Sequence, residues 1–375
     1  MIKTGNTQHN IVRKLLPIVT MIMLSFLIIF FNNKATFFDN ISGFSNTPLT
    51  KDGFFFDTYV SLTIYDSKDN YSGNIKTKED IYTLLNECMG LCDKYEKIFS
   101  RTLESSELYK LLNNSTYING DIVAISDSLY ECIDATMTYS RVFGDKYSIL
   151  SGDLCDLWDY NNASIPLDDN IANAINAINN YNILLSDNYI KLEKINMYTN
   201  SDTPDINLGA SAKGYITDKI CAYLKENGIS DAIIDLGGNI FAIGDKYDNT
   251  MYKIGIKKPF SESSAPYAVC KVAEKAIVTS GIYERYFESD GFIYHHIIDC
   301  STGYPTNNDI LSVTIIADNS HLADCYSTGC LLLGSEEALS LINATKEVEC
   351  VLITKDYSII ISDGLKYDAN YIILK

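Results

Sequence analysis

The sequence predicts an α+β fold, with mixed sheets packed against helices. Some segments, such as KEDIYTLLNECMGLCDKYEK (78–97), have apolar residues at helical spacing. Others, such as LSVTIIAD (311–318), are short and apolar and are typical of strands. The two kinds follow each other irregularly, as in α+β proteins. A hydrophobic fraction of 46%, with 27 Tyr and 15 Phe, provides for a large core. We therefore expect a globular protein and not a disordered chain.

The N-terminal segment differs from the rest of the chain. Lys3, Arg13 and Lys14 precede an uncharged apolar run from Leu15 to Phe31, which is close to the ~20 residues that span a bilayer. Basic residues on that side place the N-terminus in the cytoplasm. No small-x-small cleavage site follows, although a cleaved signal peptide stays an alternative. The predicted organisation is a cytoplasmic basic segment (1–14), a membrane anchor or signal sequence (15–31), a linker (32–53) and an extracytoplasmic domain (54–375) at the cell membrane.

Net charge and cysteine spacing limit the possible functions. A net charge of −18 repels phosphate backbones, so nucleic-acid binding is excluded. Any anionic cofactor must be neutralised locally, by a metal, a lysine or a helix N-terminus. The 10 cysteines show no CxxC motif and no regular spacing, and we expect mostly buried thiols.

The secondary-structure elements follow from periodicity and from turn residues. The opening stretch FFFDTYVSLTIYD (54–66) alternates and predicts a strand, ILLSDNYIKLEK (183–194) predicts a hairpin, and Gly228 ends a helix that follows a glycine-containing turn. Helices are expected at 78–97, 106–114, 127–142, 169–181, 206–229, 321–334 and 335–344. Further strands are expected at 232–244, with a double-glycine break, 252–259, 276–281, 283–288, 294–299 and 311–318, and two more close the chain.

Two glycine-containing segments break the local rules. NLGASAKGY (207–215) is a small-residue turn at a helix entrance, where free backbone N–H groups and Lys213 suit a phosphate. Its spacing matches neither GxGxxG nor a P-loop, so a plain helix-entrance turn is an equal alternative. DLGGNI (235–240) indicates either a structural bulge or the close approach of a ligand to the backbone.

Two further segments offer side chains for catalysis. In HHIIDCSTGYP (295–305), neighbouring strand residues point to opposite faces, so only one of His295 and His296 can face a given cavity. A histidine near Asp299 suits a general base or a metal ligand, and a histidine satisfied by backbone carbonyls is the alternative. Asp324 and Thr328 are four residues apart on a predicted helix, where they could hold Mg²⁺ or simply bond to each other.

These four segments are close to the set needed for phosphoryl transfer. Residues 54–340 resemble the FAD:protein FMN transferase family (ApbE-like) through a series of motifs that follow one another in the order typical of that family. The resemblance is carried by FFDTYVSLTIY, SRTLESSELYKLLN, DLCDLW, INLGASAKGYITD, IDLGGNIFAIG, IVTSGIYERYF, YHHIIDCSTGYP and LADCYSTGCLLLG. It implies a T-fold-like structure and an extracytoplasmic enzyme that uses FAD and Mg²⁺. Such an enzyme transfers FMN to a threonine of a target protein, typically a redox-pump subunit, and releases AMP.

The resemblance also implies roles for individual residues. It makes His296 the base, with Asp299 beside it, and Asp324 and Thr328 the metal ligands, together with the backbone carbonyl of Ala210. The positions expected to contact the flavin dinucleotide are Phe56, Tyr147, Ser148, Asn207, Lys213, Ser280, Gly281 and Ile298.

The chain departs from the family pattern at three places. Cys300 replaces the usual proline after the aspartate, Asn207 replaces a frequent aspartate, and 147–150 replaces the usual FD-x-T. Two alternatives to transfer stay open: an FAD pyrophosphatase that gives FMN and AMP, and a flavin-binding protein without catalysis.

Overall fold

The computed structural model describes residues 48–65, 77–199, 201–246 and 250–367. The predicted basic segment and membrane segment, and the linker up to residue 47, lie outside this part of the chain. Within it, no helix combines the length and the apolar character that crossing a membrane requires.

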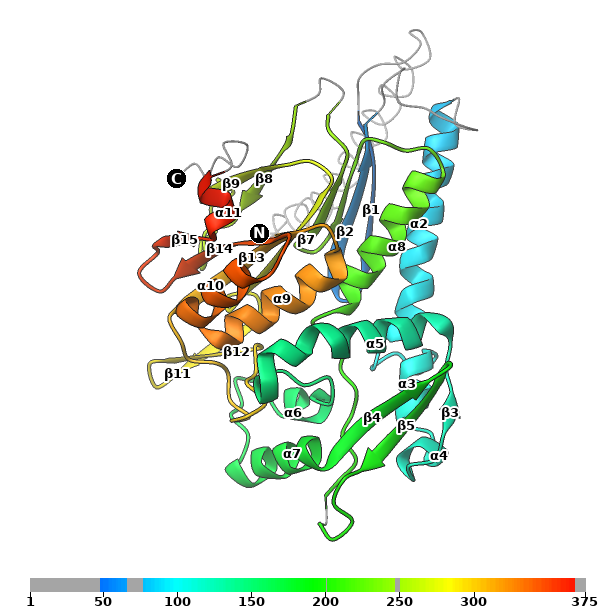
Figure 1. Ribbon diagram of the computed structural model, residues 1–375, viewed down its shortest axis with the longest axis vertical. Coiled ribbons are helices and arrows are strands. Elements are labelled where there is room, and N and C mark those ends of the chain that lie inside the picture. Colours follow the sequence, from blue (N-terminus) through cyan, green and yellow to red (C-terminus); the bar gives the residue numbers. More distant parts are fainter. Residues whose placement is uncertain (1–47, 66–76, 200, 247–249, 368–375) are drawn as a thin grey trace, which may run out of the picture. The chain divides into compact units, whose positions relative to one another are not determined.

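An eight-stranded sheet forms the centre of the described part (Figure 1), and its strand order is β1-β2-β6-β7-β10-β13-β14-β15. Every strand pairing is antiparallel. The predicted α+β class is therefore confirmed, but the prediction of mixed sheets is wrong. The strands are β1 (Leu49–Phe55), β2 (Thr58–Ile64), β6 (Ala232–Leu236), β7 (Asn239–Ile243), β10 (Lys275–Gly281), β13 (Ile310–Ala317), β14 (Val348–Thr354) and β15 (Ile359–Ile361).

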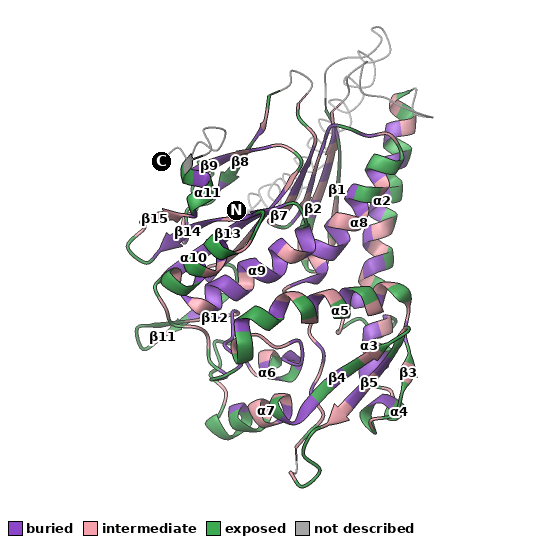
Figure 2. Cartoon of the chain, viewed as in Figure 1, coloured by how far each residue is buried: buried purple, intermediate pink, exposed green. Residues whose placement is uncertain are grey.

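Both faces of this sheet are covered. One face packs on the helices α2 (Lys78–Phe99), α8 (Ala212–Glu226), α9 (Ser320–Leu333) and α10 (Ser335–Ala344) in the largest apolar cluster. The other face packs on β8 (Tyr252–Ile256), β9 (Ala268–Val272) and α11 (Asp363–Tyr367). All residues of β13 are consequently buried, which explains its continuous run of apolar residues. Figure 2 shows burial concentrated in the central strands and in α9.

A smaller region of helices adjoins α9 and carries a second sheet, β3-β5-β4. The third apolar cluster of the described residues lies in this region and joins the helices at 152–156 and 168–180 to Trp158 and Ile298. The elements are α3 (Glu107–Leu112), α4 (Ser115–Ile118), β3 (Val123–Ala124), α5 (Asp127–Ser140), the 3₁₀ helix η1 (Arg141–Lys146), α6 (Gly152–Asp156), α7 (Asp168–Asn180), β4 (Tyr181–Ser186) and β5 (Tyr189–Lys194). The hairpin β11 (Tyr286–Ser289) and β12 (Phe292–His295) completes the fold.

The predicted helices and the 183–194 hairpin are confirmed, whereas the start of the domain differs from the prediction. The single strand expected over 54–66 is a hairpin in which β1 ends at Phe55 and β2 begins at Thr58. Phe56 and Asp57 between them both have positive φ, as in the tight turns that suit hairpin twist. Five residues of the predicted linker, 49–53, belong to β1.

The structure also tests the strand expected over 294–299 and the expected burial of the cysteines. The strand expected over 294–299 ends at His295 in β12, so His296 lies beyond the regular pairing. All ten cysteines lie in the described residues as free thiols, and all except Cys155 are buried, as expected.

Several turns that are distant in sequence meet at one edge of the large sheet, where the strands β1, β6 and β10 end. The turn after β1 touches the β6–β7 turn so closely that a Cβ on Gly237 would lie 2.0 Å from Thr58 Oγ1. The N–H of Thr279 donates to Gly238 O at 3.1 Å, which adds the end of β10. This edge carries the candidate site.

Candidate functional site

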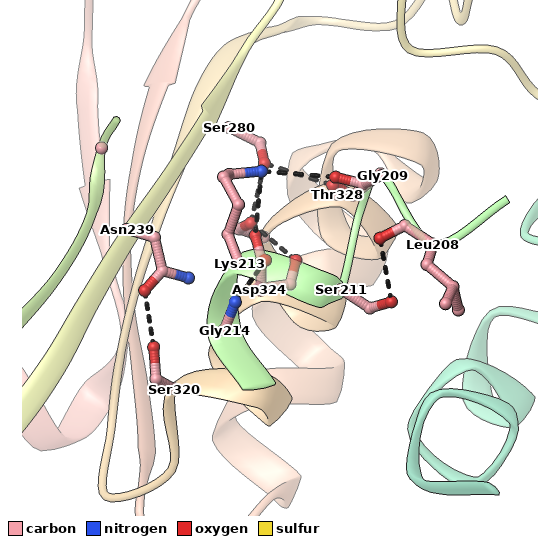
Figure 3. A network of polar contacts seen from close by, with 12 residues as sticks. Leu208, Gly209, Ser211, Lys213, Gly214, Asn239, Ser280, Ser320, Asp324 and Thr328 are labelled. Atoms are coloured by element: carbon pink, nitrogen blue, oxygen red, sulfur yellow. Dashed lines mark hydrogen bonds and ion pairs between the residues drawn. The ribbon is translucent and has the colours of Figure 1, made fainter. Parts of the chain in front are cut away.

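Helix α9 presents Asp324 and Thr328 toward the start of α8 (Figure 3). The Asp324 carboxylate, 3% exposed, accepts the Gly214 N–H at Oδ2, at 2.9 Å. This N–H belongs to the first turn of α8, where backbone donors have no partner within the helix. Thr328 Oγ1 lies 3.2 Å from Ser280 Oγ at the end of β10. The structure therefore brings the two predicted metal ligands and Ser280 together.

Lys213 supplies a positive charge beside this carboxylate. Its Nζ lies 3.9 Å from Asp324 Oδ1 and donates to Gly209 O at 3.3 Å. Gly209 and Ala210 belong to the turn that precedes the N-cap residue Ser211. The turn, the lysine and the carboxylate of a second helix therefore lie next to one another, as Figure 3 shows.

The donor set at this place fits Mg²⁺. A carboxylate, a hydroxyl and a backbone carbonyl are hard oxygen ligands, and Mg²⁺ takes few protein ligands when phosphate oxygens complete its shell. Across the described residues, no group of three or more His, Cys, Asp or Glu could hold a metal.

His295 and His296 have the divided orientation that the sequence predicts. His295 is buried and its Nε2 lies 2.9 Å from Thr306 O, so it serves the structure. His296 is half-buried, and its Nδ1 lies 3.4 Å from Arg285 O. Burial, with smaller contributions from nearby cations that include Lys213, lowers the pKa of His296 to about 4. The imidazole is thus neutral at pH 7 and lies within electrostatic range of the Lys213 ammonium.

Asp299 is directed differently from the expectation. Its Oδ1 accepts the Ser301 N–H at 2.9 Å, and its Oδ2 lies 3.6 Å from Lys146 Nζ. Since its carboxylate is engaged in the 299–304 turn and with Lys146, the hydrogen bonds found at Asp299 and His296 do not join the two side chains. Asp299 is placed to hold the turn.

The segment around Tyr147 borders Asp324, one of the two predicted metal ligands. Burial, followed by the nearby Cys325 and Asp324, raises the pKa of the Tyr147 phenol well above its ordinary value. The backbone N–H of Asn207 donates to Ile149 O at 2.7 Å. This bond connects the 147–150 segment to the turn that begins α8.

Asn207 also shapes that turn directly. Its Oδ1 accepts the Gly209 N–H at 2.9 Å, whereas Ser148 Oγ accepts the Leu150 N–H at 3.1 Å. Both side chains therefore order their own loops, and an aspartate at position 207 is not needed to accept the Gly209 N–H.

Two of the remaining predicted contact positions, Phe56 and Gly281, lie at the sheet edge. Phe56 lies in the β1–β2 turn and its N–H donates to Glu96 Oε1 at 2.7 Å. A Cβ on Gly281 would lie 2.3 Å from the Tyr283 ring, so a larger residue there would displace this ring. Ile298 is 6% exposed, and its side chain packs in the cluster with Trp158.

Sequence reasoning missed two charged residues near the site, Lys146 and Asp218. Asp218 lies on α8 and accepts the N–H groups of Ser320 and His321 at 2.8 and 2.9 Å. The one available signal was an acidic residue within the otherwise buried stretch GYITD of α8. Lys146 ends the 3₁₀ helix, and nothing in its local sequence indicates its partner Asp299.

Comparison with known proteins identifies the family of this chain. The sequence profile of the ApbE family matches residues 56–352. A relative from Treponema pallidum named FAD:protein FMN transferase is 30% identical over 303 residues, which cover 76% of this chain and 81% of that protein. A relative of the same name from Klebsiella pneumoniae is 30% identical over 242 residues, covering 64% and 73%.

Solved structures show the same fold. The ApbE protein of Thermotoga maritima superposes with a TM-score of 0.72 at 24% identity, over 85% of this chain and 98% of that one. The flavin transferase ApbE from Vibrio cholerae gives 0.71 at 23% identity, with the same coverage. Since the family profile spans most of the sequence, the chain belongs to the ApbE family.

Proposed function

We propose that this chain is an FAD:protein FMN transferase that moves FMN from FAD to a threonine hydroxyl of a target protein and releases AMP, with Mg²⁺ as its metal. It is a transferase like the relatives that share this name. The observation that carries the proposal is the meeting of Asp324, Thr328 and Lys213 at the entrance of α8. In a protein of net charge −18, this is where a diphosphate finds local positive charge.

Each residue of the site has a separate role in this proposal. The N-terminal turn of α8 and Lys213 bind the diphosphate, because both present positive charge. Asp324, Thr328 and the Ala210 carbonyl would hold Mg²⁺, which when bound draws charge from the phosphate oxygens. Neutral His296 accepts the proton of the acceptor threonine. The threonine oxygen then forms a bond to the FMN phosphorus, the bond from that phosphorus to the AMP oxygen breaks, and AMP leaves.

We further propose that the domain acts outside the cytoplasm, held at the cell membrane by residues 15–31. The support is the order of basic and apolar residues in 1–31. The acceptor would be a membrane redox-pump subunit or another extracytoplasmic flavoprotein.

The test is incubation of the protein with FAD, MgCl₂ and a threonine-containing acceptor, read by mass spectrometry for the addition of FMN. His296→Ala should lower the transfer rate by about 10²- to 10⁴-fold, the usual contribution of a general base. His321→Gln is the matched control, because His321 is buried away from solvent between Tyr139 and Tyr215. Full transfer by His296→Ala would refute the role of His296. AMP and free FMN without acceptor, at the same rate, would instead favour an FAD pyrophosphatase.

A further inference from the structure

The ammonium of Lys213 lies beside Asp324, the carboxylate that the proposed function gives to Mg²⁺. It is 3.9 Å from Asp324 Oδ1 and 3.3 Å from Gly209 O, the neighbour of Ala210 in the same turn. The Lys213 side chain is 26% exposed and that of Asp324 only 4%. A lysine on a flexible stem therefore contacts an almost buried carboxylate from the solvent side.

Asp324 needs positive charge around it, because a buried carboxylate without compensation is strongly unfavourable. The Gly214 N–H and the N-terminus of α8 supply partial charge. Lys213 supplies the one full positive charge found within ion-pair distance of Asp324 in the described residues. The carboxylate is therefore compensated before any ligand arrives.

We infer that Lys213 is the internal counter-ion of Asp324 in the ligand-free protein, and that it must leave this carboxylate when a divalent cation binds there. The inference rests on the proposed function, since it takes Asp324 as the metal ligand. A divalent cation held by Asp324 would repel an ammonium paired with the same carboxylate. The released ammonium can pair with the diphosphate of the nucleotide, which approaches the same helix entrance.

Metal and nucleotide binding are then coupled through one side chain. Without nucleotide, the metal must displace Lys213 into water, which weakens metal binding. With nucleotide, the displaced ammonium gains an anionic partner, so the metal binds more tightly. Thermodynamic linkage requires the metal to strengthen nucleotide binding by the same factor.

The experiment measures Mn²⁺ affinity of the full chain by electron paramagnetic resonance, with and without FAD, while chromatography confirms that FAD stays intact. Without FAD, Lys213→Gln should bind Mn²⁺ about 10-fold more tightly than the unaltered protein, within the range usual for coupled sites. FAD should tighten Mn²⁺ binding in the unaltered protein and much less in Lys213→Gln. Lys219→Gln is the matched control on the same helix, since Lys219 pairs with Glu131 at 2.8 Å, and its Mn²⁺ affinity should change little.

Equal Mn²⁺ affinity of the unaltered protein and Lys213→Gln without FAD would overturn the inference and leave the proposed function intact. An equal gain in Lys219→Gln would also overturn it, because the effect would then be one of overall charge. Asp324→Asn should abolish Mn²⁺ binding in every background. If no protein binds Mn²⁺ even with FAD, the proposed metal site itself fails, and the inference fails with it.

Discussion

Burial sets the protonation state of individual histidine side chains in this protein. Three histidines lie in the described residues, and burial lowers the pKa of each to about 4. His295 and His321 have structural partners, Thr306 O at 2.9 Å and Thr136 Oγ1 at 3.0 Å. Of these three, only His296 lies beside the candidate site, and its neutral state is the one that the proposed role as a base requires.

Stability should fall as the pH is lowered from about 6.5 to about 4. In this window the unfolded chain binds protons on His295 and His321, whereas the folded protein, with pKa values of about 4, does not. Each histidine contributes at most about 3 kcal/mol. Asp218, whose pKa burial raises to about 6, acts in the opposite direction and offsets part of this loss. Urea unfolding at pH 7 and pH 4.5 measures the effect. His321→Gln should flatten the pH dependence, and an unchanged pH dependence would contradict the prediction.

At the scale of elements, α8 and α9 cap each other. Asp218 of α8 accepts two N–H groups at the start of α9, and Asp324 of α9 accepts one at the start of α8. Each carboxylate thereby meets the positive end of the other helix. This reciprocal arrangement fixes the register in which Asp324 and Thr328 face Lys213.

Asp218→Asn should weaken FAD and Mn²⁺ binding, because α9 loses a charged cap and its register becomes less fixed. The loss of one charge-assisted acceptor corresponds to about 1–3 kcal/mol of stability. Asp309→Asn is the matched control, since Asp309 Oδ1 accepts the Ser335 N–H at the start of α10 at 3.0 Å. It should lower the melting temperature without changing the ligand affinities. Equal ligand affinities for both variants would show that Asp218 has only a structural role.

Gly214→Ala should destabilise the protein through the same contact between helices. A Cβ at Gly214 would lie 2.3 Å from Ser320 O, so α8 and α9 would have to separate, at a cost of about 1–3 kcal/mol. Gly90→Ala in α2 is the control, because no atom lies within 4 Å of the added Cβ. It should stabilise by about 0.5–1 kcal/mol through helix propensity. Thermal unfolding compares the two, and equal shifts would refute the argument from close contact.

For the whole molecule, the negative net charge opposes the association of FAD. The net charge is −18 and FAD is an anion, so the long-range field repels FAD while Lys213 and the start of α8 attract it at short range. Substrate capture should therefore depend on how far the repulsion is screened.

The association rate of FAD should rise when the salt concentration is raised from about 10 mM to about 100 mM, because the screening length falls from about 30 Å to about 10 Å. Stopped-flow flavin fluorescence measures this rate. Riboflavin, which lacks phosphates, is the control ligand and should show little dependence on salt. A rate that falls with salt for FAD would mean that local positive charge dominates the approach.

Much of this fold could be predicted from local pattern, because periodicity reports which face of an element is buried. The helical period placed Asp324 and Thr328 on one face of α9. The different surroundings of His295 and His296 were also expected, although the strand that was to separate them ends at His295. Local pattern could not show that 49–53 pairs with β2, since that short strand is polar and largely exposed.

The partners of charged groups were also beyond prediction from sequence. Asp299 faces Lys146 and Asp218 faces the start of α9 because of how distant segments fold together. Those contacts have no local signature, and the same holds for the strictly antiparallel pairing.

The antiparallel order of the central sheet has one further consequence. The strands that end at the candidate site are joined laterally by backbone hydrogen bonds: β2 pairs with β6, the Thr279 N–H of β10 donates to Gly238 O, and β10 pairs with β13. A ligand that clamps one turn would therefore restrain its neighbours across the ladder. Amide protons of β10 and β13 near this edge should exchange with deuterium more slowly when FAD is bound, whereas those at the opposite end of the same strands should keep their rates.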